Sequence, residues 1–206
     1  MACSCSHDSE YPEDTWNLYQ HIANVEAMNA AGDPAAARLI FKPHARRLDP
    51  EPSLSSDDDE EIIIKIWFKG PVSVRKICVA SIGGDPDEHP VEVRCYPGQG
   101  AEPLGFDSLD DAEQAQTMPT PFDPEANAFS QCSLRPFTRI SFLLLHFPGN
   151  HGEGERTRIS YIGMQGDHTH AKREAVHAKY EVIPNANDSA QVRGENTLSN
   201  ASKPGL

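Results

Sequence analysis

Short segments with the residue pattern of β-strands recur along the chain, separated by turns rich in glycine and proline. The segment 139–147 carries apolar residues at odd and even positions alike, which is typical of a strand buried on both faces. The segment 91–96 alternates apolar with polar residues, as a strand with one solvated face does. Seven or eight such segments, with at most one helix, predict an all-β fold: an antiparallel sandwich or jelly roll.

A run of five carboxylates stands directly before the most strongly strand-forming segment. The run is Asp57, Asp58, Asp59, Glu60 and Glu61, and Ile62 to Phe68 follows it at once. Because the carboxylates repel one another while isoleucine and aromatic residues favour strands, we expect a loop that leads into a strand. After Gly70-Pro71, the apolar alternation of 72–82 changes phase, which predicts a β-bulge near Arg75 and Lys76.

Other segments carry weaker patterns. Leu18, Ile22, Val25 and Met28 have the spacing of one helical face, so a short N-terminal helical segment is expected. The stretch 97–124, rich in Pro, Gly and Asp, predicts a long irregular loop, and 128–134 is a weaker strand candidate. We expect one domain over residues 14–183, between a flexible tail (1–13) and a polar, disordered tail (184–206).

The charge of the chain limits its partners. With 31 acidic and 18 basic residues the formal charge is −13, which disfavours nucleic acid and anionic membranes and favours a basic protein surface. No apolar run approaches the ~20 residues that span a bilayer, and the N-terminus lacks the pattern of a signal peptide. We therefore expect a protein of the cytoplasm, and of the nucleus as a second location, in which Cys78, Cys95 and Cys132 remain small buried thiols without disulfides.

A search for catalytic or metal motifs finds none that is complete. Phosphate-binding loops and nucleophile elbows are absent, and the acidic run lacks the spacing of a calcium loop. Cys3-x-Cys5-x-His7 has too few ligands for a closed zinc site, and is either an incidental tail or a weak metal-binding one. The sequence thus predicts a binding domain, not an enzyme, with no cofactor.

A different function is indicated mainly by one segment, His168-x-His170 followed by Glu174. It is similar to the first metal-binding element of cupins, because two histidines at i and i+2 on a strand share a face. The second cupin element does not follow. A ligand-binding jelly roll, holding a metal through these histidines or holding a sugar, remains the alternative function.

Several motifs occur together in a fixed order along the chain. They are Phe41-Lys42-Pro43 with Arg47 and Asp49, the acidic segment 54–62, Phe68-x-Gly70, and Tyr161-Ile-Gly163-x-x-Gly166. This order resembles the PITH domain family, found at the C-terminus of proteasome-interacting thioredoxin-like proteins and in stand-alone relatives. The resemblance implies a jelly roll of the galactose-binding-like type, association with the 26S proteasome, and no catalysis by the domain.

The resemblance also suggests which residues bind and where the chain departs from the family. We expect the acidic run to form part of the partner surface and Phe41-Lys42-Pro43 to brace the fold beside it. His44 stands where the family usually has an aromatic residue, and His168 also replaces a ring. The thioredoxin half, with its Trp-Cys-x-x-Cys motif, is missing, so no thiol exchange is expected.

Overall fold

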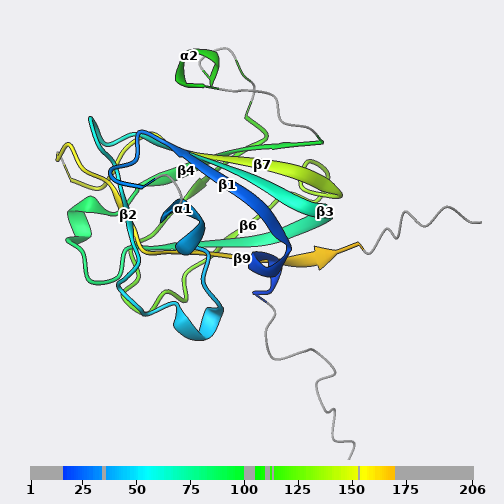
Figure 1. The fold of residues 1–206 in the computed structure, drawn as a ribbon, viewed down its shortest axis with the longest axis horizontal. Coiled ribbons are helices and arrows are strands. Elements are labelled where there is room, and N and C mark those ends of the chain that lie inside the picture. The colour runs from blue at the N-terminus through cyan, green and yellow to red at the C-terminus, as the bar shows by residue number, and fades with distance from the viewer. Residues whose placement is uncertain are drawn as a thin grey trace, which may run out of the picture. The chain divides into compact units, whose positions relative to one another are not determined.

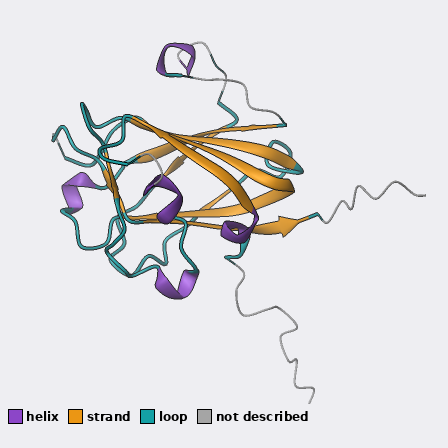
Figure 2. Cartoon of the chain, in the orientation of Figure 1, coloured by secondary structure: helices purple, strands orange, loops and turns teal. Residues whose placement is uncertain are grey.

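A computed structural model of the chain describes residues 16–33, 36–99, 105–109, 112, 114–152 and 154–169. Strands dominate this part of the chain, and its helices are single turns in the connections (Figure 2). The strands are β1 (Ile22–Met28), β2 (Leu54–Ser55), β3 (Ile62–Ala80), β4 (Glu92–Gly98), β5 (Gln116–Pro119), β6 (Ser130–Gln131), β7 (Ile140–Phe147), β8 (Arg158–Ile159) and β9 (Tyr161–His168). The helical turns are η1 (Leu18–His21), α1 (Ala36–Leu39), η2 (His44–Arg46), η3 (Pro86–Glu88) and α2 (Phe106–Leu109).

The strands form two layers that share β3 (Figure 1). In one layer the order is β1-β3-β7-β4-β5, and all neighbouring strands are antiparallel. The second half of β3 pairs instead with β9 and with the short β6. The predicted antiparallel β-sandwich is confirmed.

The prediction of two separate strands around Gly70-Pro71 is wrong, because β3 is one strand of 19 residues. Its pairing with β7 runs from Ile62 to Trp67 and resumes only at Val72, so the ladder is interrupted where Pro71 has no N–H to donate. The chain bends there from one layer into the other. The predicted bulge is confirmed, since the register with β9 shifts between Val74 and Lys76.

The N-terminal segment is a helical turn followed by a strand, and the predicted helical face is wrong beyond His21. A register shift between Ile22 and Asn24 marks a bulge in β1. The extra residue puts Ile22 and Val25, three positions apart, on the same buried face. Met28 lies on the opposite face. A bulged strand therefore reproduced a helical spacing.

The long stretch after β4 holds more regular structure than predicted. It contains α2 and the edge strand β5, which pairs with β4 from Gln116 to Pro119. These residues lack the clean apolar alternation of a strand, because only Met118 of β5 is buried. The candidate strand 128–134 shrinks to the two residues of β6.

The apolar residues form one large core between the layers and two smaller clusters on their outer faces. One outer cluster, with Ile63, Tyr96, Phe142 and Leu144, packs beneath Phe106 and Leu109 of α2 and its flanks. Cys78, Cys95 and Cys132 are buried free thiols, as predicted, and burial raises the pKa of Cys78 and of Cys132 to about 12. Within the residues that the structure describes, no helix has the length and apolar character needed to cross a membrane.

Candidate interaction surface at the acidic loop

The acidic run lies in the loop 56–61, which joins β2 to β3 at one end of the sandwich. This loop is tied to the segment 148–157: Ser56 and Thr157 exchange hydrogen bonds through their backbone groups and the Ser56 hydroxyl, each 2.9 Å long. The Thr157 hydroxyl also donates to the Glu60 carbonyl at 2.6 Å. The segment 85–91 joins the same end through the bond from His151 N to His89 O, 2.9 Å long (left in Figure 1). Three connections therefore support one another.

Asn29, just after β1, fixes the shape of the acidic loop. Its side-chain amide donates to Asp59 Oδ1 at 2.5 Å and to the Glu61 carbonyl at 2.6 Å. Its side-chain oxygen accepts the Asp58 N–H at 2.9 Å. One side chain thus holds three residues of a loop that is about thirty positions away in sequence.

The five carboxylates fall into two groups. Asp59 accepts the Glu61 N–H at 3.0 Å, and the Glu61 carboxylate meets Nε2 of the buried His146 at 2.5 Å, so both acids bond within the fold. The carboxylates of Asp57, Asp58 and Glu60 have no hydrogen-bond or ion-pair partner among the residues that the structure describes. We call these three the outward acids. They are the part of the run whose charge is not paired within the described fold.

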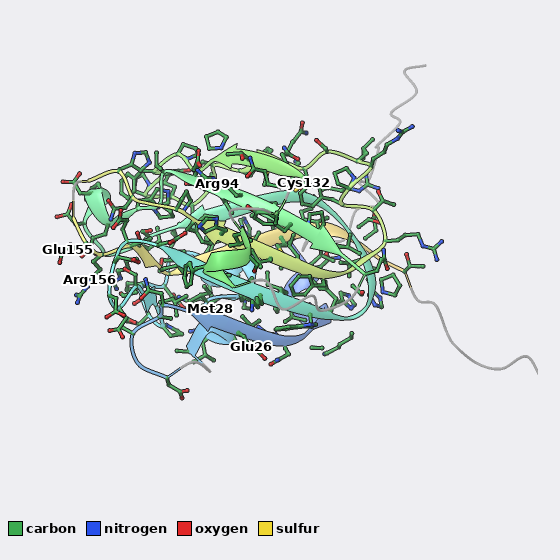
Figure 3. All side chains as sticks on the ribbon, turned by 90° about the horizontal axis from the view of Figure 1, so that it is seen from above. Glu26, Met28, Arg94, Cys132, Glu155 and Arg156 are labelled. Atoms are coloured by element: carbon green, nitrogen blue, oxygen red, sulfur yellow. The ribbon has the colours of Figure 1, made fainter. Side chains whose placement is uncertain are left out.

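An open pocket of about 420 Å³ lies beside the loop, lined by Asn29, Asp58, Asp59, Glu61 and Phe106. In the sheet next to the pocket, four residues lie opposite one another on neighbouring strands: Met28 on β1, Ile63 on β3, His146 on β7 and Arg94 on β4. Figure 3 shows Met28 and Arg94 on opposite sides of the central strands. Because Arg94 is paired with Glu92 at 2.9 Å, it leaves the acidic character of the pocket intact. The carboxylates that line the pocket and the ring of Phe106 suit a cationic side chain.

A sequence model of the PITH domain matches residues 8–184. The chain belongs to the PITH domain family. The PITH domain-containing protein 1 of Xenopus laevis is 32% identical over 192 residues, which cover 90% of this chain and 88% of that protein. The human protein of the same name is 28% identical over 193 residues, with the same two coverages of 90% and 88%.

The fold of this PITH domain is similar to solved structures of galactose-binding-like jelly rolls. A fucolectin from striped bass (Morone saxatilis) serum aligns with a TM-score of 0.50 and 11% identity, over 73% of this chain and 48% of that one. At this identity the likeness shows the fold alone. The predicted limits of the domain, 14–183, stay a prediction, as do the two tails, which lie outside the described residues.

Three segments that carry the resemblance to the PITH family pack within the fold, and the first is Phe41-Lys42-Pro43. Phe41 lies in the main core, and Lys42 is buried, its ammonium donating to the Asp49 carbonyl at 2.8 Å. Burial lowers the pKa of Lys42. Phe41-Lys42-Pro43 therefore braces the turn 42–49.

The Tyr161-Ile-Gly163-x-x-Gly166 motif forms most of β9, and its glycines allow close approach. A Cβ on Gly163 would collide with the ring of Tyr161, and one on Gly166 would collide with the carbonyl oxygen of Ser73 on β3. In the Phe68-x-Gly70 motif, Phe68 is a core residue, and a Cβ on Gly70 would lie 3.1 Å from Nε2 of His168.

His44 and His168, which the resemblance places at aromatic positions of the family, both make ring contacts. His44 stacks on Trp16, with centroids 5.2 Å apart, and its Nδ1 lies 3.1 Å from the Tyr161 hydroxyl. His168 stacks on His21, with centroids 3.9 Å apart. His170 lies outside the described residues, as does the Cys3-x-Cys5-x-His7 segment. In the part of the chain that is described, no three His, Cys, Asp or Glu side chains are grouped as a metal site needs.

Sequence reasoning located the acidic run but missed Asn29, His146 and Thr157, which hold it. Their partners lie 32, 85 and 97 positions away, and no short motif records such pairings. The available signals were an asparagine at the end of a strand and a histidine in an otherwise apolar strand.

Proposed function

We propose that this PITH domain is a non-enzymatic protein-interaction module that docks on a basic surface of a protein complex. The candidate complex is the 26S proteasome, and the cellular setting is the cytoplasm or nucleus. The contact is made by the outward acids Asp57, Asp58 and Glu60. The observation that carries the proposal is that these carboxylates are unpaired in a loop which other side chains hold in one shape.

A loop fixed in advance favours binding for two physical reasons. The ordering entropy that a flexible loop would lose on association has already been lost on folding. Exposed charges of one sign also steer a complementary surface into place and raise the association rate at low salt. Membership of the PITH domain family, for which a protein-interaction role is expected, supports a role without catalysis.

Affinity capture from cell lysate tests the proposal. The tagged chain is expected to recover proteasome subunits, and Asp57→Lys with Asp58→Lys to abolish that recovery while the protein stays folded. Glu26→Lys with Glu125→Lys is the matched control, because it makes the same change in net charge at exposed residues outside the acidic loop and outside the segments bonded to it.

Two outcomes of the affinity capture would contradict the proposal. Recovery of the proteasome by the wild type and by both double variants would remove the acidic loop from the contact. Failure of the wild type to recover any proteasome subunit, in lysates where a tagged proteasome subunit recovers the whole complex, would remove the proteasome as the partner.

A further inference from the structure

The basic residues of this acidic chain are not evenly distributed. The segments 62–84 and 126–152 contain none of the 31 acidic residues, yet they carry Lys65, Lys69, Arg75, Lys76, Arg135 and Arg139. In the structure these two segments are neighbours, because β3 pairs with both β6 and β7. In a chain of net charge −13 these two neighbouring segments therefore contribute basic residues and no carboxylate, although β1 places Glu26 opposite Lys65 and β9 places Asp167 on Arg75.

The turn 131–139, which joins β6 to β7, lies along the second half of β3. Cys132 N donates to the Arg75 carbonyl at 2.9 Å, and Val74 N donates to the Phe137 carbonyl at 3.0 Å. We call this segment the basic turn. Figure 3 shows Cys132, at its start, well away from Glu155 and Arg156 at the acidic-loop end.

The arginines of the basic turn are exposed and uncompensated. Arg75 on β3 is paired with Asp167 at 2.6 Å, and Lys76 lies over the Phe129 ring, 4.2 Å from its centroid. Arg135 and Arg139, in contrast, have no ion-pair partner in the described part of the chain. Leu134 stands beside them with 75% of its surface exposed, more than any other large apolar residue that the structure describes.

Arg139 is held in a backbone conformation that arginine disfavours. Its φ is 57°, in the left-handed region. Its N–H donates to Ser73 Oγ at 3.2 Å, and its carbonyl accepts from the Gln99 side chain at 2.5 Å. The Thr138 hydroxyl closes the turn on the Leu134 carbonyl at 2.5 Å. Glycine would fit position 139 without strain, so an arginine there points to a use for the guanidinium.

We propose that the basic turn binds a short acidic segment of a partner protein, with Arg135 and Arg139 pairing its carboxylates and Leu134 packing on an apolar residue within it. The site is independent of the acidic loop and goes beyond the function proposed above. Guanidinium groups suit carboxylates because they can donate two parallel hydrogen bonds. Leu134 adds a contact that a purely ionic ligand would not use.

The net charge decides which acidic ligand fits. A short segment responds mainly to charges within roughly 8 Å, the screening length at physiological salt, and so experiences the basic turn. A long polyanion such as nucleic acid, or a second copy of the chain at −13, also meets the acidic remainder of the molecule and is repelled.

Binding of a labelled peptide to the whole chain, measured by fluorescence anisotropy, tests the proposal. The probe is a short fluorescein-labelled peptide of Asp and Glu residues around one central Leu. We expect saturable binding that Arg135→Glu with Arg139→Glu weakens by about tenfold or more. Arg46→Glu with Arg156→Glu, the same charge change at exposed arginines elsewhere, should leave the affinity unchanged.

Two further variants separate binding from folding. Arg139→Gly should lower the affinity for the peptide, because it removes the guanidinium, and should raise the melting temperature, because it removes the backbone strain. Leu134→Ser should lower the affinity for the Leu-containing peptide but not the affinity for a matched peptide with Ser in its centre. Charge reversal at Asp57 and Asp58 should leave peptide binding intact, so failure here is distinct from failure of the acidic loop.

Three outcomes would overturn the proposal. The first is peptide binding that is absent or unaffected by the double arginine variant. The second is tighter, arginine-dependent binding of a labelled single-stranded RNA. The third is self-association in sedimentation that the double arginine variant abolishes, since the occupant would then be a second copy.

Discussion

Asn29 combines two properties that few other residues share. It adopts a left-handed backbone conformation, with φ of 55°, which asparagine tolerates better than most side chains. Its side chain also makes both donor and acceptor bonds to the acidic loop. The shape of the loop that carries the outward acids therefore depends on a residue outside that loop.

Two substitutions at Asn29 separate these properties. Asn29→Gly keeps the backbone conformation but loses the side-chain hydrogen bonds, and we expect it to destabilise the fold by about 2 kcal/mol. Asn29→Ala loses the bonds and adds backbone strain, so the expected loss is larger by about 1 kcal/mol. Urea denaturation measures both. Equal stability of the two variants would show that the φ value is not a constraint.

His89 makes the stability of the domain depend on pH. The ring is fully buried, with Nδ1 2.8 Å from Ser81 Oγ and Nε2 2.9 Å from the Thr120 carbonyl. Burial, as the largest cause, lowers the pKa of His89 to about 4, although the bond to Thr120 acts in the opposite direction. The unfolded chain therefore binds a proton at a higher pH than the folded one does.

The sign and size of this pH effect follow from that difference. The stabilisation from a neutral His89 is complete above pH ~6.5 and is lost as the pH falls towards about 4, a total of about 3 kcal/mol. His89→Gln cannot titrate, so its stability should be lower at neutral pH but should fall less between pH 7 and pH 4. Urea midpoints at the two pH values check this. Parallel losses in wild type and variant would assign the acid sensitivity to other groups.

Among the elements, β9 requires glycine where it pairs closely with β3. Gly166 has no room for a methyl group, because a Cβ would overlap the backbone carbonyl of Ser73, which cannot rotate away. Gly166→Ala should cost about 3 kcal/mol. Gly154→Ala is the control, since nothing lies within 4 Å of a Cβ there, and it should be neutral or slightly stabilising. Thermal unfolding distinguishes the two, and an unchanged melting temperature for Gly166→Ala would contradict the close crossing.

Bulges explain where the sequence predicted the elements and where it did not. In β3 the phase change near Arg75 was legible because apolar residues stand on both sides of it. In β1 the bulge at Ile22–Asn24 has too few strand residues before it, so the spacing of its apolar residues predicts a helix. The acidic run could be located because it is continuous, but its division into paired and outward acids depends on Asn29 and His146. Contacts between distant residues of that kind have no local pattern.

At the scale of the whole molecule, β3 connects everything. It forms hydrogen-bonded ladders with β1, β7, β6 and β9 and contributes residues to all three apolar clusters. Neither layer can separate from the other while β3 stays intact. The two layers should therefore unfold in a single cooperative transition, as small single domains usually do.

The buried cysteines report on that cooperativity from different places. Cys95 and Cys132 belong to the main core, whereas Cys78 lies in the outer cluster beside Tyr161. Burial raises the pKa of Cys95 well above its usual value, and it raises that of Cys78 to about 12, so the native thiols are both inaccessible and protonated. A disulfide reagent attacks thiolates. Each of the three should therefore react only when the domain opens.

Single-cysteine variants, with every other cysteine changed to Ser, make this measurable. Under native conditions the three thiols should react with a disulfide reagent at rates that give the same opening free energy, within about 0.5 kcal/mol of the unfolding free energy of each variant from urea. Adding urea should raise all three rates with the same slope, because each reaction exposes the surface of the whole domain. A faster, urea-insensitive reaction at Cys78 would show that its outer cluster opens separately while the shared strand stays folded, and that β3 does not couple the layers.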